Sequence, residues 1–306
     1  MKNKILIGSL LLLVGTLAHA EITPKYYKWM NGEIKYSAWD KGYTGQGTQI
    51  VILDFFTTTN PFYAKLDNVN VQARHGSHVA KMARLLAPNS TIKHIDYYDK
   101  TRNELPIDST KLNVINASFS VFMNKDVVKP GEVSGNYPFL VQSLIDHAHR
   151  GRSVVVKAAG NYGVNMGEHL TSGTYTDRED ALNTSLLTSK SAIFAGALSN
   201  FGTSTNKASL ASYSNKAGLD LEFQKRFLVT GVRSYEIGVA GTSLAAPIIS
   251  SYASILGSKF KTATPTQVAN QLLSTARTDT LVNYDPSIYG RGEVSLSRAL
   301  SPVSLK

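Results

Sequence analysis

The sequence predicts an α/β fold, a largely parallel sheet covered by helices on both faces, in a single domain. Short apolar runs without alternation, such as Ile50-Val51-Ile52-Leu53, are typical of strands buried on both faces. These runs alternate along the chain with segments of helical periodicity, which is the pattern of βαβ units. Residues 21–306 contain no internal repeat, linker or change of composition, so one domain is expected there.

The first twenty residues form a segment of a different kind. Lys2 and Lys4 precede an apolar run over residues 5–17, and Ala18-His19-Ala20 follows it. A basic start, a short apolar centre and an A-x-A site predict a secretory signal peptide, residues 1–20, cleaved after Ala20. The run is short for a membrane span, so an uncleaved anchor is the less favoured alternative. The mature chain is expected to be exported, secreted or periplasmic, without a membrane span.

The composition is that of an ordinary globular protein, with 42% hydrophobic and 18% charged residues among 306. There is no cysteine, so no disulfide is expected, and a chain of this length can bury a sizeable core without one. The formal net charge is +10, but the basic residues are scattered among acids without a run of five like charges. This distribution favours a solvated surface over a nucleic-acid groove.

The expected elements follow in order. The first strand, residues 49–54, ends in Asp54, at the edge where open α/β sheets place their sites. An amphipathic helix then opens at His75 or Gly76 and ends before Pro88, because apolar residues recur there at helical spacing. Further strands are expected at residues 91–97, 112–118, 153–156, 192–197 and 227–229, and further helices at residues 139–149, 244–256 and 265–276.

Two segments late in the chain differ in character. Thr242 and Ser243 are expected to cap the helix of residues 244–256, which places a serine hydroxyl beside the positive end of a helix. Residues 162–191 are polar and are expected to form irregular surface loops that border a substrate cleft.

Three polar residues, Asp54, His75 and Ser243, each stand at a predicted strand end or helix start. Alone, Asp54 would more often cap a turn, and Ser243 would more often be an N-cap. Together they suit nucleophilic catalysis, because a serine hydroxyl needs a base to take its proton and a carboxylate orients the imidazole. Asn161, which follows Gly160 after a strand, is a candidate donor to an oxyanion, although asparagine is common in turns.

His75 and His78 raise the alternative of a metal site. The spacing lacks the H-x-x-x-H pattern and a nearby acidic ligand, so no metal site is expected. His78 is interpreted as structural support for the helix start, and His75 as the candidate base.

The chain resembles the subtilisin-like serine peptidases (subtilases) in four motifs that come in the family's order. They are residues 50–54 (IVILD), 75–80 (HGSHVA), 158–161 (AAGN) and 241–247 (GTSLAAP). The resemblance implies a subtilisin-like fold with Ser243 as nucleophile, His75 as general base and acid, Asp54 as orienting carboxylate and Asn161 as oxyanion donor. It also implies substrate-binding segments along both sides of the cleft, which include Asn116, Ser118, Phe119, Ser120, Ala158, Ala159 and Gly160. The other hydrolase motif, G-x-S-x-G, fails because Ala245 replaces its second glycine.

The chain departs from the subtilase pattern at several positions. Phe55 and Phe56 follow Asp54, where subtilases usually carry Ser or Thr and then Gly, so the hydrogen bonds around Asp54 are expected to differ. A side chain at Ser120, where a glycine is common, is expected to narrow the cleft. Calcium is implied by the family, but the usual loop is absent from the short helix before Pro88, so no cofactor is expected. Residues 21–53 leave no room for an N-terminal propeptide, which implies unaided folding or a chaperone or inhibitor in trans.

The motifs favour an exported serine endopeptidase that acts on a protein or peptide substrate through an acyl-enzyme. Two alternatives stay open. One is a catalytically weak or inactive binding protein on the subtilase fold, suggested by Phe55, Phe56, Ser120 and the missing propeptide. The other is a secreted esterase, which small ester substrates would distinguish from a peptidase.

Overall fold

The computed structural model describes residues 33–56, 69–124, 127, 129–132, 135, 137–171, 173, 176–232 and 240–305. The predicted signal peptide, residues 1–20, and its cleavage after Ala20 lie outside the described residues. Within these ranges no helix combines the length and the hydropathy that crossing a bilayer requires.

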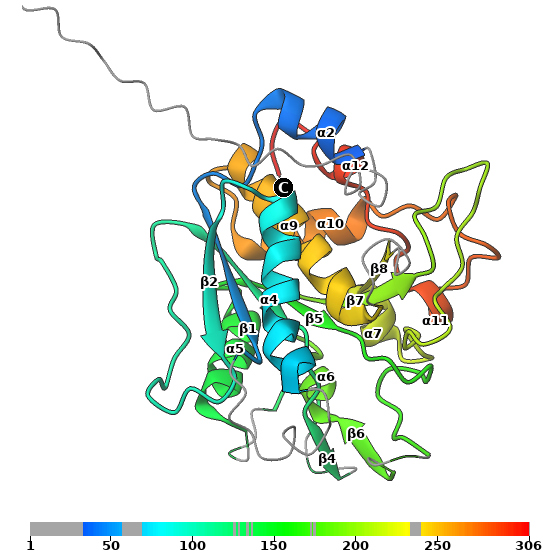
Figure 1. Ribbon diagram of the computed structural model, residues 1–306. Coiled ribbons are helices and arrows are strands. Elements are labelled where there is room, and N and C mark those ends of the chain that lie inside the picture. The colour runs from blue at the N-terminus through cyan, green and yellow to red at the C-terminus, as the bar shows by residue number, and fades with distance from the viewer. Residues whose placement is uncertain are drawn as a thin grey trace, which may run out of the picture.

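A six-stranded parallel sheet forms the centre of the molecule (Figure 1), in the order β2-β1-β3-β5-β7-β8. Its strands are β1 (Thr48–Asp54), β2 (Thr91–Asp96), β3 (Leu112–Ala117), β5 (Val154–Ala158), β7 (Ala192–Leu198) and β8 (Phe227–Gly231). These bounds confirm the six predicted strands to within two residues. A separate antiparallel pair joins β4 (Phe122–Asn124) to β6 (Arg178–Asp180).

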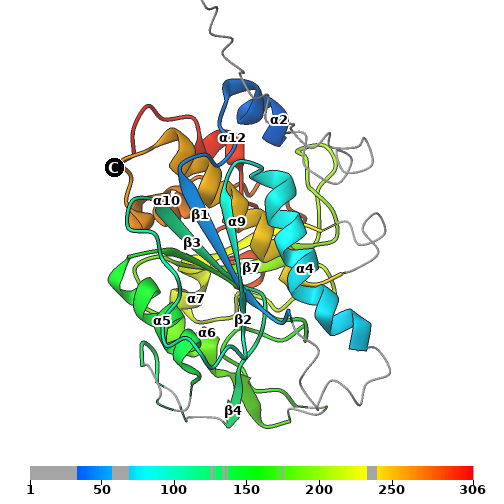
Figure 2. The same ribbon diagram turned by 60° about the vertical axis from the view of Figure 1, so that its left-hand side comes forward.

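Helices cover both faces of the parallel sheet (Figure 2), which confirms the predicted fold class. The long helices are α4 (Val69–Leu86), α5 (Phe139–Arg150), α9 (Thr242–Lys259) and α10 (Pro265–Ser274). The short ones are α2 (Glu33–Ser37), η1 (Trp39–Lys41), α6 (Ala181–Leu186), α7 (Leu221–Arg226), α11 (Pro286–Tyr289) and α12 (Leu296–Ala299).

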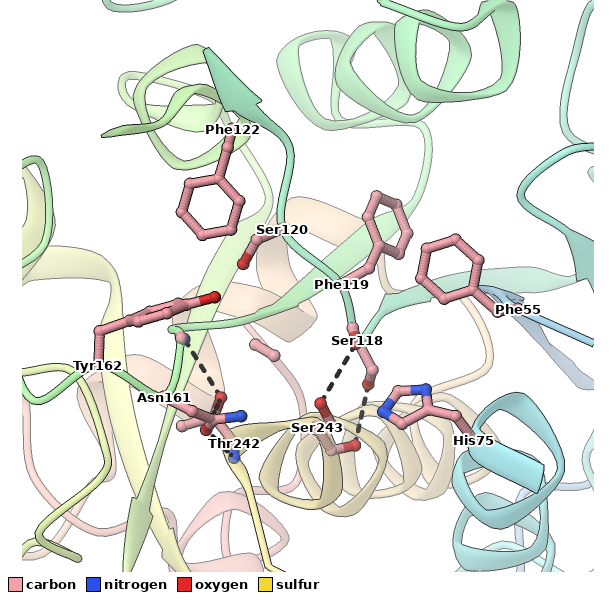
Figure 3. A pocket seen from close by; sticks show the side chains of 12 residues that line it. Phe55, His75, Ser118, Phe119, Ser120, Phe122, Asn161, Tyr162, Thr242 and Ser243 are labelled. Carbon is pink, nitrogen blue, oxygen red and sulfur yellow. Dashed lines mark hydrogen bonds between the residues drawn. The ribbon is translucent and has the colours of Figure 1, made fainter. Parts of the chain in front are cut away.

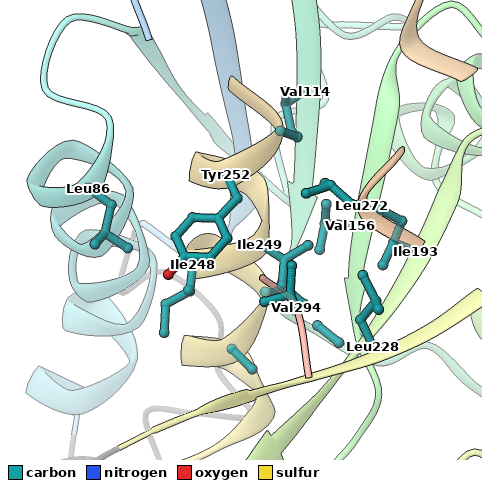
Figure 4. Packing of buried hydrophobic residues seen from close by; sticks show 14 of the residues in the cluster. Leu86, Val114, Val156, Ile193, Leu228, Ile248, Ile249, Tyr252, Leu272 and Val294 are labelled. Carbon is teal, nitrogen blue, oxygen red and sulfur yellow. The ribbon is translucent and has the colours of Figure 1, made fainter. Parts of the chain in front are cut away.

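The two faces of the sheet belong to two separate hydrophobic clusters. In β1, Ile50 and Ile52 pack toward α4 and α9, whereas Val51 and Leu53 pack in the cluster that includes the buried side of α5. Successive side chains of a strand point to opposite faces, so a strand covered on both sides is apolar throughout. Figure 4 shows the first cluster, in which Ile248, Ile249 and Tyr252 of α9 lie between α4 and the strands.

Helix α9 is buried along nearly its whole length, and only Ser243 and Lys259 are partly exposed. A helix that is apolar all round belongs in the core of a larger domain. Its first turn is therefore packed on all sides except that of Ser243. The position of Ser243 follows from this packing.

Three of the predicted boundaries are wrong. Helix α4 begins at Val69, not at His75 or Gly76, because apolar residues at helical spacing start only in its second half. The N-cap of α9 is Gly241, with a φ of 144° that favours glycine, so Thr242 and Ser243 belong to the first turn. The stretch 162–191 contains β6 and α6, which are too short to leave a periodic pattern.

Candidate active site

The carboxyl edge of the parallel sheet carries a pocket of about 220 Å³ (Figure 3). Asp54 ends β1, Ser118 follows β3 and Asn161 follows β5, so neighbouring strands deliver polar residues to one edge. The first turn of α9 brings Ser243 to the same place. The pocket is lined by Phe55, His75, Ser118, Phe119, Ser120, Phe122, Ala158, Gly160, Asn161, Tyr162, Thr242 and Ser243.

Asp54 and His75 form a short contact in which Nδ1 of the imidazole lies 2.6 Å from the carboxylate Oδ1. Gly76 permits this approach, because a Cβ on it would lie 2.9 Å from both the Phe55 carbonyl oxygen and the Phe56 ring. The Gly76 N–H also donates to that carbonyl at 3.2 Å. Without a side chain at Gly76, α4 packs closely against the end of β1, and this brings His75 into contact with Asp54.

The two groups change each other's acidity. Burial raises the pKa of Asp54 above its ordinary value, although the hydrogen bond and charge of His75 oppose this. Burial lowers the pKa of His75, but the hydrogen bond and charge of Asp54 outweigh it and raise the His75 pKa overall. An ionised, oriented carboxylate beside an imidazole stabilises the imidazolium form.

The two carboxylate oxygens of Asp54 differ in their hydrogen bonding. Oδ1 accepts from the Phe55 N–H at 2.7 Å, whereas the buried Oδ2 has no hydrogen-bond partner among the described residues. Phe55 carries no hydroxyl that could donate to it. Its ring packs instead against Tyr97 and Phe119, with centroid distances of 5.1 and 6.2 Å.

The Ser243 hydroxyl donates to the Ser118 carbonyl oxygen at 3.2 Å. In the part of the chain that the structure describes, no hydrogen bond joins it to His75, although both side chains line the same pocket (Figure 3). The Ser243 N–H lies in the first turn of α9, where backbone N–H groups lack partners within the helix.

A chain of buried hydrogen bonds ties β3 to α9 behind the pocket. Pro247 has no N–H to bond the Ser243 carbonyl, so that carbonyl accepts from Ser118 Oγ at 2.9 Å. Ser118 Oγ in turn accepts from Asn116 Nδ2 at 2.9 Å, and Asn116 Oδ1 accepts from Ser250 Oγ at 3.1 Å. These side-chain hydrogen bonds therefore fix the position of α9 relative to the end of β3.

The oxygen and the nitrogen of the Asn161 side chain point in different directions. Its Oδ1 accepts from the Thr242 N–H at 2.8 Å and from Thr242 Oγ1 at 2.9 Å. With Oδ1 held, the amide nitrogen is turned toward Ser243 (Figure 3). A Cβ at position 241 would lie 3.2 Å from this nitrogen, so Gly241 leaves room for it.

The predicted site residues divide into two groups. Asp54 and His75 are in contact, and His75, Ser243, Asn161, Ser118, Phe119, Ser120, Ala158 and Gly160 line the pocket. Asn116 and Ala159 were predicted to bind substrate, but both are fully buried outside the lining, where Asn116 supports Ser118 and Ala159 packs in the core. Sequence reasoning missed Phe122, which no motif marks. It named Phe55, Tyr162 and Thr242 beside the motifs but did not assign them to the lining of the site.

Among the described residues, no group of three or more His, Cys, Asp or Glu side chains is gathered that could hold a metal ion. The calcium implied by the family resemblance therefore has no cluster of carboxylates among these residues to hold it.

A polar pocket at the carboxyl edge of a parallel sheet is a common arrangement in enzymes. The model of the subtilase family matches residues 52–292, most of the sequence. The chain therefore belongs to the subtilase family and is a serine peptidase.

Comparison with curated proteins gives no match. Among solved structures, the chain is similar to the prenylagaramide maturation protease PagA (17% identity, TM-score 0.55, covering 88% of this chain and 98% of that one). It is also similar to a lanthipeptide protease (19% identity, TM-score 0.57, covering 90% of this chain and 94% of that one). A third similar structure is the MycP3 protease of the type VII (ESX-3) secretion system (18% identity, TM-score 0.55, covering 92% of this chain and 88% of that one). At such identities the likeness concerns the fold.

Proposed function

We propose that this chain is an exported endopeptidase in which Ser243 is the nucleophile and His75 the general base and acid. Asp54 orients His75, and Asn161 Nδ2 together with the Ser243 N–H stabilises the oxyanion. The single observation that supports this most is the 2.6 Å contact between His75 and the buried Asp54 on the wall of the pocket that holds Ser243.

The chemistry follows from these positions. The Ser243 hydroxyl leaves the Ser118 carbonyl, turns toward His75 and attacks the substrate carbonyl carbon, while its proton passes to the free ring nitrogen of His75. The tetrahedral oxyanion accepts hydrogen bonds from Asn161 Nδ2 and the Ser243 N–H. The C–N bond then breaks as His75 returns the proton to the leaving amine. Water, deprotonated by His75, attacks the acyl-enzyme, and Ser243 leaves with that proton.

A fluorophosphonate probe tests the assignment directly, because it reacts only with an activated serine. We expect the chain of residues 21–306 to be labelled, and Ser243→Ala and His75→Ala to be unlabelled although folded. Labelling that persists in Ser243→Ala would overturn the assignment.

One observation favours a second candidate, a binding protein that holds peptides without cutting them. The Ser243 hydroxyl is hydrogen-bonded to the Ser118 carbonyl oxygen, and Asp54 Oδ2 has no hydrogen-bond partner among the described residues, so these contacts are not arranged for proton transfer from Ser243 to His75. Catalytic hydrogen bonds often form only with substrate bound, and this supports the peptidase. An unlabelled but folded wild type that binds peptides would favour the binding protein. Labelling with hydrolysis of p-nitrophenyl esters alone would favour an esterase.

Export rests on the sequence pattern of residues 1–20. We expect the chain recovered outside the cytoplasm to begin at Glu21, as N-terminal sequencing would determine. A cytoplasmic chain that still begins at Met1 would overturn this part of the proposal. We further propose that activity does not require calcium, so that excess chelator should leave probe labelling unchanged.

A further inference from the structure

A small chamber adjoins the Ser243 pocket. Its volume is about 10 Å³, and Ser120, Phe122 and Tyr162 line both cavities. The chamber therefore lies next to the pocket, on the other side of these three residues. A volume of this size holds about one water molecule.

Two aromatic rings stand at the junction. Phe122 and Tyr162 lie edge to face, with centroids 5.4 Å apart and planes at 89°. They come from different elements, because Phe122 begins β4 and Tyr162 follows Asn161 after β5. Figure 3 shows both rings on the side of the pocket away from His75, with Ser120 between them. A side chain that enters from Ser243 meets this pair before it reaches the chamber.

Buried polar contacts hold both rings in place. Lys157 is fully buried, and its Nζ lies 2.9 Å from the Asp180 carboxylate, whose other oxygen accepts from the Val121 N–H at 2.9 Å. Val121 precedes Phe122, so this ion pair anchors the backbone that carries the first ring. The Tyr162 N–H donates to the buried Asn215 at 3.0 Å, which anchors the second.

The lining of the chamber is partly polar. Asn183 lines it and is buried, and Asn183 Oδ1 has no hydrogen-bond partner among the described residues. An apolar side chain pushed against this oxygen would leave it unpaired and without solvent. The chamber therefore does not suit a long apolar side chain while both rings are in place.

We propose that Phe122 and Tyr162 restrict the residue before the scissile bond to small side chains such as glycine, alanine and serine. This inference rests on the proposed peptidase function. The rings fill the space that a larger side chain would occupy, and the remaining chamber is too small to receive one. Phe122 is the specificity-determining residue, because its removal would join the pocket to the chamber.

The test uses peptides that differ only in the residue before the cut, alanine or phenylalanine. For the wild type we expect kcat/KM for alanine to exceed that for phenylalanine by at least about tenfold, as steric exclusion from a packed site implies. Phe122→Ala should reduce this ratio at least about tenfold, mainly by faster cleavage of the phenylalanine peptide. Phe139→Ala is the matched control, since Phe139 is exposed and outside the pocket, and should keep the wild-type ratio.

Tyr162→Ser provides a second variant, because Tyr162 is partly exposed and its loss removes the other ring without emptying the core. It should shift the ratio in the same direction. Fluorophosphonate labelling in parallel separates the two proposals. A labelled wild type that cleaves both peptides equally well would overturn this inference alone. An unlabelled, inactive wild type would overturn the peptidase function and this inference with it.

Discussion

Glu293 is a buried carboxyl group that makes the stability of the fold depend on pH. It follows α11, and its backbone pairs with Arg277 through hydrogen bonds of 2.7 and 2.8 Å. Burial raises its pKa to about 7 from an ordinary 4.5, although the Gly202 N–H and the charge of Arg277 act in the opposite direction. The folded chain therefore holds a proton that the unfolded chain releases between pH 4.5 and 7.

The sign and size of the effect follow from this difference. Because the folded state binds more protons in this window, the free energy of unfolding falls as the pH rises. The contribution is complete below pH 4.5 and is lost once the pH passes 7. Each pH unit corresponds to about 1.4 kcal/mol, so the total loss is roughly 3 kcal/mol.

Glu293→Gln isolates the contribution of Glu293 ionisation to stability. Glutamine keeps the side-chain volume and the acceptor for the Gly202 N–H at 3.2 Å, but it does not ionise. The assay is urea unfolding between pH 4.5 and 8, with both proteins carrying Ser243→Ala to prevent self-cleavage. The difference in the free energy of unfolding between the protein with Glu293 and the protein with glutamine should change by roughly 3 kcal/mol across this range. Two curves that stay parallel with pH would refute the reasoning.

Three further variants probe the site. Asn161→Ala should lower kcat by at least about tenfold with a smaller change in KM, because the proposed hydrogen bond from its amide forms with the oxyanion and not with the bound substrate; an unchanged kcat would refute the role. Asp54→Asn should move the midpoint of the kcat/KM pH profile to lower pH, because the carboxylate is what raises the pKa of His75; an unmoved midpoint contradicts this. Asn116→Ala should cost roughly 2–3 kcal/mol in urea unfolding, because it leaves buried partners unpaired; a loss below about 0.5 kcal/mol would show that they find other partners.

Asn161→Asp serves as the control for the first of these variants. It keeps an oxygen for Thr242 but has no N–H to give to an oxyanion. If the role of Asn161 were only to hold Thr242, the aspartate variant would retain activity. We expect it to be as impaired as the alanine variant or more so.

The strands of the parallel sheet were predictable because burial on both faces leaves uninterrupted apolar runs, as in β1 and β7. The start of α4 was not, because its first turns carry no apolar period. Likewise β4 and β6 have three residues each, which is too short for a pattern. Local periodicity reports burial on one face over many residues, so short elements escape it.

The residues of the pocket were predictable to a different degree. Motifs pointed to His75 and Ser243. The family resemblance implied that Asn116 binds substrate, whereas its amide is hydrogen-bonded to Ser118 and Ser250. The meeting of Phe122 with Tyr162 depends on how β4 and β6 bring distant segments together, which no local spacing encodes. Which polar side chains face solvent is decided by tertiary packing.

Ser243 lies in the most C-terminal segment that lines the pocket. This position affects when the pocket can assemble during synthesis. Asp54, His75, Ser118 and Asn161 all leave the ribosome well before Ser243, which is held in place only once the buried helix α9 has packed against strands from across the sheet. Chains emerge N-terminus first, and contacts between distant segments form late. A partly synthesised chain thus lacks an assembled pocket. The order of elements itself delays assembly of the pocket until α9 has been synthesised and has packed against the sheet.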